Sequence, residues 1–424
     1  MKKIFSLIFV LLLGVSVMLS GCAILPAQMD AENLMAGVKT EDWPKTPDLP
    51  DQKALQGMRG FAADLLLASL GNKGNIMISP VSVYLALAMT LNGADHETRE
   101  AMLNVLAEKD ITVEMIDQAS RDLIILLSRD SAKTKISIAN SIWFNESFQP
   151  DQLFLQTNAD YFRAGARKLD FSDEKSPAII NGWVEQETNG LIKKIIEKIS
   201  PSTVMFLINT VYFKSDWQVP FLQQETRKMN FNAASGPLMT DFMHRTDKMN
   251  FFSGDGVIGV ALPYEDQQFS YFAMMTEDQS DPRVWLANQN KDQLFTGIAN
   301  LMAQKANFTV DLLLPKYEAE YEDSLLNELD ALGMGIAFDG GRADFSLLNA
   351  AHAKGLFISE VKHKTFIRVD EKGTEAAAAT SVAIDESAIM ADKELIFDRP
   401  FIYGIMDVKT GIPLFIGVLE SPAK

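Results

Sequence analysis

The stretch that most constrains the fold is Asp370 to Met390, DEKGTEAAAATSVAIDESAIM. Four consecutive alanines, Ala376 to Ala379, favour a helix, whereas the Val382 and Ile384 that follow favour a strand. Gly373 comes just before the alanines, where a backbone pivot would be wanted. Local propensity therefore predicts no single secondary structure for this stretch.

Strand side chains alternate between two faces, so the parity of this stretch is informative. The even-numbered positions are small or apolar: Thr374, Ala376, Ala378, Thr380, Val382 and Ile384. The odd-numbered positions hold both charges: Glu375, Ala377, Ala379, Ser381, Ala383 and Asp385. Such a segment could enter a sheet with its even side chains buried, up to Glu386, where a charge falls on the buried face. The alternative is a solvated loop or a helical turn between two strands, because short parity patterns are ambiguous.

The N-terminus has the residue order of a secretion signal. Met1 to Lys3 is basic, Ile4 to Leu19 is apolar, and Leu19 to Cys22 resembles a bacterial lipobox, in which Cys22 becomes the acylated first residue of the mature chain. The alternative is a membrane-spanning anchor, for which the apolar run is short. We therefore expect a signal peptide over 1–21 and a lipoprotein held on an extracytoplasmic membrane face through Cys22.

Charge and cysteine content exclude several classes of function. The net charge of −17 disfavours a nucleic-acid partner, because binding to a phosphate backbone needs clustered Lys and Arg. Cys22 is the only cysteine. The chain therefore has no internal disulfide and no cysteine nucleophile, and its stability must come from packing.

The remaining chain is predicted to form a tether and one domain. Residues 22–52 contain four prolines among polar residues, which indicates an extended tether. Residues 53–424 have a globular pattern without a second linker or an internal repeat, and they can bury a large core. We expect a single domain over this range.

Helical and strand-like runs mix without a steady βαβ alternation, which favours an α+β fold. Helices are expected at Ala54–Leu70, Val81–Leu91, Gln152–Phe162, Ser176–Thr188 and Tyr321–Leu332. Strands are expected at Asn75–Ile78, Ile136–Phe144, Met205–Phe213, Val257–Leu262, Phe269–Met275 and Phe308–Leu314. Ser79 can cap the helix that starts with Pro80, a residue that suits a first helical turn.

Catalytic and metal-binding motifs are not apparent, so we expect neither an enzyme nor a cofactor. Gly254 to Gly259 fits the letters of a dinucleotide fingerprint, but a strand ended by Pro263 follows it instead of a helix, which indicates a turn. Histidine spacing and the absence of cysteine pairs argue against a metal site. No nucleophile elbow appears. An acidic secreted hydrolase whose Ser/His/Asp triad is assembled only by the fold stays open.

Two single residues allow both a structural and a functional interpretation. Trp217 could stack on a ligand or anchor the core, and His363 could be a catalyst or a hydrogen-bonded core histidine. The structural role is the more common one for both residue types in such settings.

Several stretches together resemble the serpin family, in the family's order and over essentially all of residues 53–424. They are NIMISPVSVYLALAMTLNGA (Asn75–Ala94), INGWVEQETNGLIKKII (Ile180–Ile196), LINTVYFKSDWQVPF (Leu207–Phe221), DLLLPKY (Asp311–Tyr317), LGMGIAF with ADFSLL, VKHKTFIRVDEKGTEAAAAT (Val361–Thr380) and FDRPFIYGI (Phe397–Ile405). The resemblance implies three β-sheets, eight or nine helices and an exposed reactive-centre loop.

The resemblance also implies a function. A serine protease, or a papain-like cysteine protease, would cleave the loop and form an acyl-enzyme. The loop would then insert into the main sheet as a new strand and trap the protease. The partner would be the target protease, and the inhibitor would be a monomer. The rival interpretation is a non-inhibitory serpin that acts as a surface binding protein.

The resemblance assigns two groups of residues by position. The hinge of the loop comprises Glu371, Gly373, Thr374, Glu375, Ala376, Ala377, Ala378 and Ala379. The switch that lets the main sheet open comprises Ser79, Ser82, Asn209, Trp217, Lys316 and His363. Lys316 and Glu371 match a pair that can form an ion bridge at the top of this sheet. The even positions from Thr374 to Ile384 lack the prolines, bulky residues and charges that block insertion in non-inhibitory members.

The family's usual spacing from Glu371 places the reactive bond at Ser387–Ala388. A loop shorter by one residue would place it at Glu386–Ser387, and Met390–Ala391 is a third possibility. Ser387 suits a protease with a small specificity pocket, whereas Glu386 suits an acid-selective one.

Overall fold

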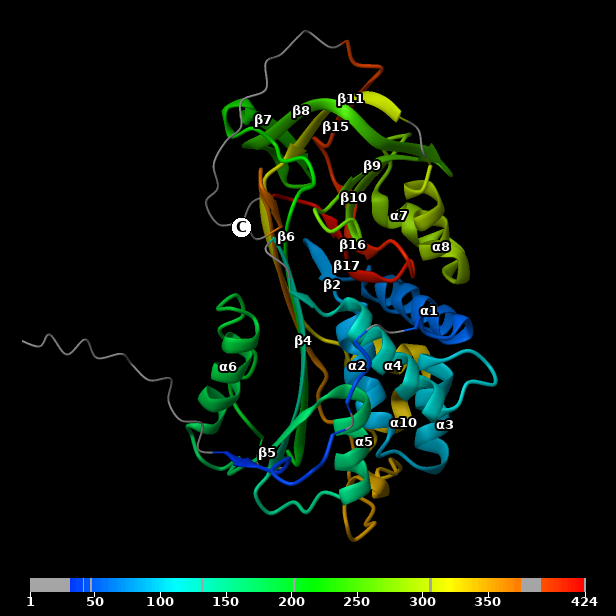
Figure 1. The fold of residues 1–424 in the computed structure, drawn as a ribbon, viewed down its shortest axis with the longest axis vertical. Coiled ribbons are helices and arrows are strands. Elements are labelled where there is room, and N and C mark those ends of the chain that lie inside the picture. Colours follow the sequence, from blue (N-terminus) through cyan, green and yellow to red (C-terminus); the bar gives the residue numbers. More distant parts are fainter. Residues whose placement is uncertain are drawn as a thin grey trace, which may run out of the picture. The chain divides into compact units, whose positions relative to one another are not determined.

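Two hydrogen-bonded β-sheets and the helices around them make up the computed structural model (Figure 1). The structure describes residues 31–40, 42–45, 48–130, 133–200, 203–304, 307–374 and 390–422. The described residues lie within one unit, Ala31–Lys424. Helices and strands mix without a regular alternation, so the predicted α+β class is confirmed.

The first sheet has the order β1-β5-β4-β6-β14-β13-β12, and β3 pairs with β4. Its strands are β1 (Glu32–Asn33), β3 (Arg129–Asp130), β4 (Thr134–Asn145), β5 (Gly165–Leu169), β6 (Met205–Asp216), β12 (Tyr317–Ser324), β13 (Lys362–Val369) and β14 (Gly373–Thr374). β4 and β6 pair along their whole length, from Thr134 opposite Ser215 to Phe144 opposite Met205.

The second sheet has the order β15-β11-β8-β9-β10-β16-β17-β2, and β7 pairs with β8. Its strands are β2 (Ile76–Ile78), β7 (Arg227–Ala233), β8 (Gly236–Gly254), β9 (Val257–Pro263), β10 (Phe269–Thr276), β11 (Asn307–Pro315), β15 (Lys393–Ile396), β16 (Phe401–Asp407) and β17 (Pro413–Leu419). β8 pairs first with β7 and β11 and then with β9. The family resemblance implied three sheets. Because β8 is continuous, two of them are joined here into one hydrogen-bonded sheet.

Helices lie on both faces of the first sheet, and α7 and α8 pack against the second (Figure 1). The helices are α1 (Gln52–Ser69), α2 (Pro80–Leu91), α3 (His96–Leu106), α4 (Val113–Leu127), α5 (Gln152–Phe162), α6 (Ser176–Glu187), α7 (Pro282–Ala287), α8 (Lys291–Met302), α9 (Leu326–Leu329) and α10 (Gly335–Phe338). α6 lies on one face, and α2, α4 and α5 lie on the other (Figure 1). α2 is buried almost all round, because it packs against β6 on one side and β17 on the other.

Local signals in the sequence explain two of these elements. The Ser79 hydroxyl accepts the backbone N–H of Ser82, and Pro80 is the first residue of α2, as the start signal predicts. β8 and β9 are joined by Asp255 and Gly256, whose φ angles of 54° and 79° suit a two-residue hairpin. The run that resembles a dinucleotide fingerprint is therefore the predicted turn.

The helix predicted at Tyr321–Leu332 is wrong in its first part. β12 continues to Ser324, and α9 begins only at Leu326. Tyr317, Ala319 and Tyr321 are buried and alternate with glutamates, which is the period of a strand with one face in the core.

Part of the predicted tether packs against the domain. β1 pairs with β5, and Trp43 and Pro50 are buried, so residues 31–50 are not a free linker. In the part of the chain that the structure describes, no helix is long and apolar enough to cross a membrane.

Candidate functional site

The start of the predicted loop is already a strand of the first sheet. β14 pairs antiparallel with β6, with Gly373 opposite Asp216 and Thr374 opposite Ser215. On its other side Thr374 pairs with Val369 of β13. The hinge therefore lies as a short wedge between β6 and β13, at the end of β6 that carries Ser215.

Thr374 is buried on the inner side of this wedge. Its side chain is 2% exposed, and its hydroxyl shares a 2.5 Å hydrogen bond with the hydroxyl of Tyr264. Burial raises the pKa of the Tyr264 hydroxyl well above its ordinary value, so Tyr264 stays protonated. Thr374 thus has the inward orientation that the parity pattern predicts for even positions.

Gly373 is required by close packing of the backbone. A Cβ atom at this position would overlap the carbonyl oxygen of Ser215 and lie 2.8 Å from the Cα of Asp216. Only a residue without a side chain lets the hinge approach β6 this closely.

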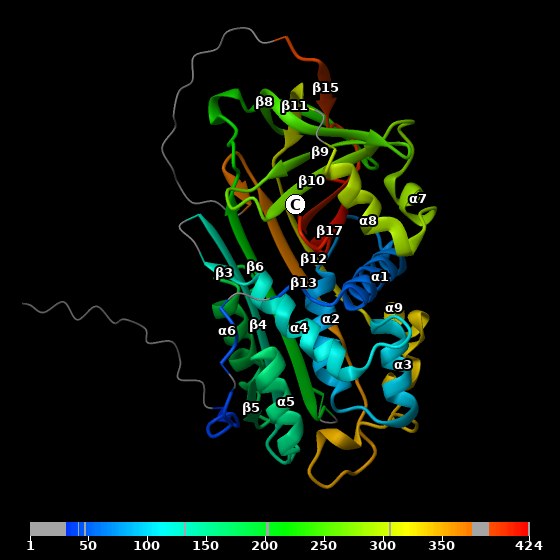
Figure 2. The same ribbon diagram turned by 45° about the vertical axis from the view of Figure 1, so that its right-hand side comes forward.

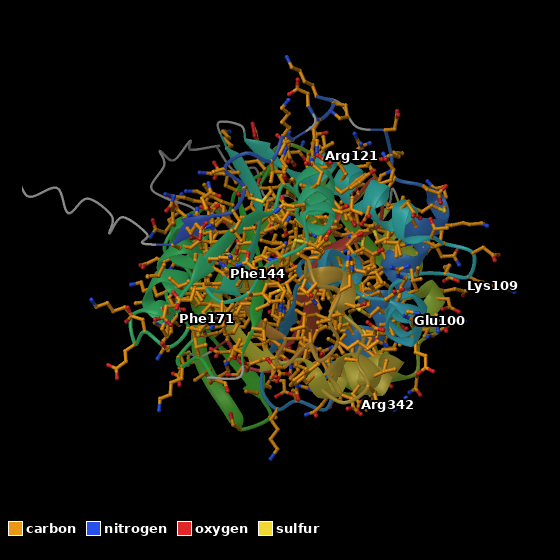
Figure 3. All side chains as sticks on the ribbon, turned by 90° about the horizontal axis from the view of Figure 1, so that it is seen from below. Glu100, Lys109, Arg121, Phe144, Phe171 and Arg342 are labelled. Carbon is orange, nitrogen blue, oxygen red and sulfur yellow. The ribbon has the colours of Figure 1, made fainter. Side chains whose placement is uncertain are left out.

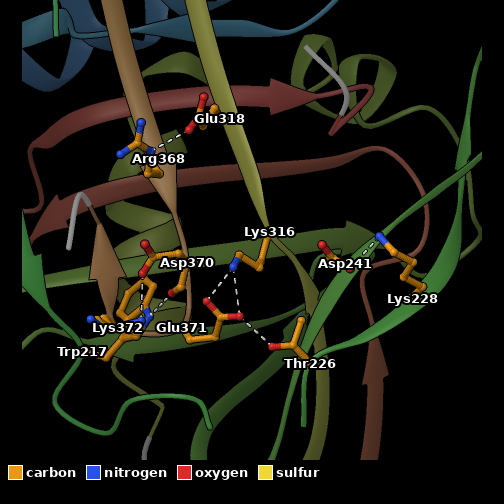
Figure 4. Close-up of polar contacts among 10 residues, drawn as sticks. All are labelled: Trp217, Thr226, Lys228, Asp241, Lys316, Glu318, Arg368, Asp370, Glu371 and Lys372. Atoms are coloured by element: carbon orange, nitrogen blue, oxygen red, sulfur yellow. Dashed lines mark hydrogen bonds and ion pairs between the residues drawn. The ribbon is translucent and has the colours of Figure 1, made fainter. Parts of the chain in front are cut away.

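Trp217 joins the end of β6 to the hinge. Its indole N–H donates to the carbonyl of Asp370 at 2.9 Å, and its backbone N–H donates to the carbonyl of Lys372 (Figure 4). The ring is 2% exposed and stacks on Tyr264 at a centroid distance of 4.8 Å. Trp217 is therefore a core anchor that contacts the hinge, which favours the structural interpretation.

An ion pair closes the top of the wedge. Lys316 Nζ lies 2.8 Å from Oε2 of Glu371, and the Thr226 hydroxyl donates to Oε1 (Figure 4). Burial alone would raise the pKa of Glu371, but the hydrogen bonds from Lys316 and Thr226 and the charge of Lys316 hold it below its ordinary value. Glu371 therefore stays ionised. The ion pair fastens the hinge to the junction of β11 and β12, and the Thr226 hydrogen bond fastens it to the segment before β7.

A second polar cluster lies under the middle of the first sheet, and we call it the floor cluster: Ser79, Ser82, Asn140, Asn209 and His363. His363 Nε2 accepts the backbone N–H of Ser79 at 3.1 Å, so the neutral ring carries its proton on Nδ1. Burial lowers the pKa of His363 to about 4, against a small opposing effect of the Asp323 charge. His363 is a hydrogen-bonded core histidine.

Asn209 links two strands within the floor cluster. Its amide donates to Oδ1 of Asn140 on β4, and its backbone carbonyl accepts the hydroxyl of Ser82. The buried Oδ1 of Asn209 accepts no hydrogen bond from the described residues. One acceptor of the cluster is therefore available to another donor.

A cavity of about 100 Å³ adjoins the floor cluster. It lies between α2, the first half of β6 and the segment that leads into β13. Its lining includes Ser82, Leu87, Leu207, Asn209, Val361 and His363.

The structure gathers the predicted switch residues into two groups. Trp217, Lys316 and the hinge residues Glu371, Gly373 and Thr374 meet at one end of β6. Ser79, Ser82 and His363 meet around Asn209, six residues or about 20 Å along the same strand. The predicted residues Cys22, Glu375, Ala376, Ala377, Ala378, Ala379, Glu386, Ser387 and Ala388 lie outside the described residues. Whether the two groups act as a switch stays a prediction.

Three contact residues were missed by the sequence analysis. Tyr264 reaches Thr374 from the turn after β9, Thr226 precedes β7, and Asn140 lies opposite Asn209 on β4. Their contacts depend on how distant segments meet, and no local pattern marks them. In the part of the chain that the structure describes, no group of three His, Cys, Asp or Glu side chains could hold a metal ion.

Comparison with known proteins agrees with this architecture. An uncharacterized serpin-like protein of Thermococcus kodakarensis is 32% identical over 88% of this chain and 86% of its own length. Neuroserpin of Mus musculus is 31% identical over 84% of this chain and 88% of its own length.

The crystal structure of the thermophilic serpin tengpin in its native state is 36% identical, with a TM-score of 0.84, and covers 92% of this chain and 99% of that one. For tengpin in its latent state the TM-score is 0.77, with 89% of this chain and 100% of that one covered. The arrangement of this chain is thus more similar to the native state.

The model of the family described as serpin (serine protease inhibitor) matches residues 56–422. This match spans the hinge, the floor cluster and every strand of the two sheets except β1. The chain therefore belongs to the serpin family.

Proposed function

We propose that this serpin inhibits serine proteases as a suicide substrate and is not itself an enzyme. A protease cleaves the reactive-centre loop and is held as an acyl-enzyme. The cleaved loop then inserts between β6 and β13 and carries the protease with it. The observation that carries this proposal is the wedge of Gly373 and Thr374, which already separates these two strands.

The lack of pairing between β6 and β13 beyond the wedge among the described strands, called the gap below, favours insertion. In the described residues, β14 lies between β6 and β13, and these two strands are not hydrogen-bonded neighbours. Their facing edges can therefore pair with a new strand. Asn209 offers a free buried acceptor beside this gap, and the adjoining cavity leaves room for small side chains. The alanines at even positions after Thr374 have the size that such a space admits.

The direction of the hinge fixes the direction of insertion. β14 is antiparallel to β6, so residues after Thr374 would continue from Ser215 toward Met205. From Thr374 to Ser387 an inserted strand would span about 45 Å. It would gain on the order of ten hydrogen bonds at roughly 1 kcal/mol each, which is comparable to the stability of a whole domain.

We propose Ser387–Ala388 as the reactive bond, with Glu386–Ser387 and Met390–Ala391 as alternatives. To test inhibition, the chain without residues 1–22 is incubated with elastase, subtilisin, chymotrypsin and a Glu-specific protease. The expected product is a complex with one of them that survives boiling in detergent. Mass spectrometry of the released peptide then identifies the bond. Clean cleavage without a complex throughout the panel would favour the non-inhibitory interpretation.

We also propose that the chain is anchored to an extracytoplasmic membrane face through acylated Cys22. The basic, apolar and small residues of 1–22 support this proposal. More than one acyl chain on one terminus suffices for lasting attachment. Replacement of Cys22 with Ser should abolish the incorporation of a labelled fatty acid into the chain. Incorporation equal to that of the unmodified chain would contradict lipidation at Cys22.

A further inference from the structure

Residues 31–50 fix the N-terminal part of the chain to one place on the domain. Glu32 and Asn33 pair with β5, and the backbone N–H of Leu34 donates to Ala166 at 3.0 Å. Trp43 is 9% exposed, and its indole N–H donates to the carbonyl of Asp160 in α5. The Arg163 guanidinium lies 4.1 Å from the centre of the Trp43 ring.

The register of the first sheet shows which end this attachment occupies. Glu32 lies opposite Lys168, Lys168 lies beside Phe144, and Phe144 lies opposite Met205. The hinge lies beside Ser215, ten residues along β6 from Met205, or about 33 Å away. The N-terminal attachment and the hinge are therefore at opposite ends of the sheet.

Both ribbon views agree with this register. β5 lies at the bottom and β15, the first strand after the loop, lies at the top (Figures 1 and 2). Seen from below, Figure 3 labels Phe144, the last residue but one of β4, and Phe171, two residues after β5. Residues 390–396 re-enter the domain at the top, so both flanks of the loop lie far from β1.

The register of β1 shows at which end of the first sheet the described chain begins. β1 is antiparallel to β5, so the chain traced backward from Asn33 to Glu32 runs along Arg167 and Lys168 toward Leu169. Leu169 pairs with Asn145, the last residue of β4. The described chain therefore begins at the end of the sheet opposite the hinge.

The chain between this end and the membrane is short. Eight residues lie between Cys22 and Ala31, and even a fully extended chain over these nine positions spans only about 30 Å. If the apolar segment 4–19 stays in the membrane, Ala31 is also close to it. The net charge of −17 opposes close contact between the sides of the domain and an anionic lipid surface.

We propose that the anchored protein stands with its β5 end toward the bilayer and presents its reactive-centre loop away from it. This orientation rests on the proposed membrane attachment. The expected position of the trapped protease rests on the proposed loop insertion as well. Because insertion runs from Ser215 toward Met205, the trapped protease would be carried from the outer end to the membrane-facing end. A protease of about 230 residues has a diameter near 45 Å, so it would lie beside the anchor, close to the lipid surface.

Energy transfer to the bilayer tests the orientation. The full chain is acylated in a bacterial host and reconstituted in vesicles of zwitterionic and phosphatidylglycerol lipids that contain an acceptor lipid. Donor dyes are attached to Glu174→Cys, in the exposed turn after β5, or to Glu394→Cys, exposed on β15. Because acylation blocks Cys22, each introduced cysteine is the only free thiol.

Transfer from position 174 should be several-fold greater than from position 394. Insertion of about 20 Gly/Ser residues between Ala27 and Gln28 should reduce the difference, because a flexible chain lets the domain turn and move away. Equal transfer from the two positions, greater transfer from 394, or failure of the full chain to float with vesicles would overturn the orientation.

A second energy-transfer experiment tests the inhibitory mechanism independently of the orientation. A donor-labelled protease with its catalytic serine replaced by alanine should bind the loop and give weak transfer. The active protease, once trapped, should give strong transfer. Absence of a trapped complex would count against the proposed function while the first experiment still decides the orientation. A trapped protease with transfer as weak as that of the inactive protease would overturn the predicted delivery to the membrane-facing end.

Discussion

At the scale of single residues, Thr374→Arg should leave cleavage of the loop intact but reduce trapping of the protease. The Thr374 side chain is already enclosed beside Tyr264 before cleavage, so an arginine there would have to leave the core and hold the hinge out of the sheet. Insertion of the loop would then have to bury this unpaired charge. A cost of several kcal/mol should slow insertion enough for the acyl-enzyme to hydrolyse. We expect the yield of detergent-stable complex per cleaved inhibitor to fall about tenfold or more.

Ser381→Arg is the matched control for Thr374→Arg. It adds the same charge at an odd-numbered position, which the parity pattern predicts to face solvent after insertion. This variant should trap protease as the unmodified chain does. Equal loss of complex in both variants, or full trapping by Thr374→Arg, would refute the parity argument.

His363 should make stability depend on pH. The folded chain binds a proton at His363 only near pH 4, whereas the unfolded chain binds one near pH 6.5. Between these values the unfolded state holds more protons. The free energy of unfolding should therefore fall as pH decreases through this window, by roughly 3 kcal/mol in total. Above pH 6.5 this contribution is constant.

The pH effect of His363 must be separated from that of Asp117. Burial raises the pKa of Asp117 to about 7, although a hydrogen bond from Asn92 opposes the shift. The folded state then holds the extra proton between about pH 4 and 7, and the sign is opposite to that of His363. Urea unfolding of the chain and of His363→Gln at pH 7.5 and 5 isolates the histidine. The variant should lose less stability on acidification, and parallel losses would contradict the assignment.

Some of the site residues could be predicted from the sequence, and others could not. Lys316 and Glu371 form the ion pair that the family resemblance implies, because the resemblance transfers positions across the whole fold. The alternation of small and charged residues predicted that Thr374 faces inward, because the period of a strand is a local property of the sequence. No sequence pattern predicted the contacts of Tyr264 and Thr226, because these contacts join residues that are 110 and 145 positions apart in the sequence.

At the scale of elements, most of the helices and strands that local patterns predicted lie near their true bounds. α2 begins with a Ser79 cap and Pro80, and α5 begins with an Asp151 cap followed by periodic apolar residues, all of which are local features. The error at Tyr321–Leu332 arose where a strand runs almost directly into a helix, so that two periods overlap. The packing of residues 31–50 could not be seen, because their proline-rich composition also suits a linker.

Trp43 should hold residues 31–50 on the domain. Trp43→Ala removes a nearly buried ring, its hydrogen bond to Asp160 and its contact with Arg163. The loss of such a side chain costs about 3 kcal/mol. We expect proteolytic cleavage within residues 31–50 to accelerate by about a hundredfold, measured by limited proteolysis and mass spectrometry.

Leu49 provides the matched control within the same segment. It is 52% exposed, so Leu49→Ala removes an apolar side chain that contributes little to the docking. Its proteolysis rate should equal that of the unmodified chain. If Trp43→Ala and Leu49→Ala behave alike, Trp43 does not hold the segment.

At the scale of the whole molecule, the first sheet divides into two parts that the hinge keeps apart. β5, β4 and β6 form one part, and β13 and β12 form the other. Only the two residues of β14 connect them through hydrogen bonds within the described strands. A strand that completes this sheet would make it continuous, so the molecule should be more stable after its loop is cut than before.

The most direct test of this account compares guanidinium unfolding of the intact chain with that of the chain cleaved in the reactive-centre loop. The cleaved chain stays associated and, if the loop inserts, gains on the order of 10 kcal/mol from new hydrogen bonds. We predict a large shift of its unfolding midpoint to higher denaturant concentration, with Thr374→Arg reducing the shift. An unchanged or lower midpoint after cleavage would contradict insertion between β6 and β13.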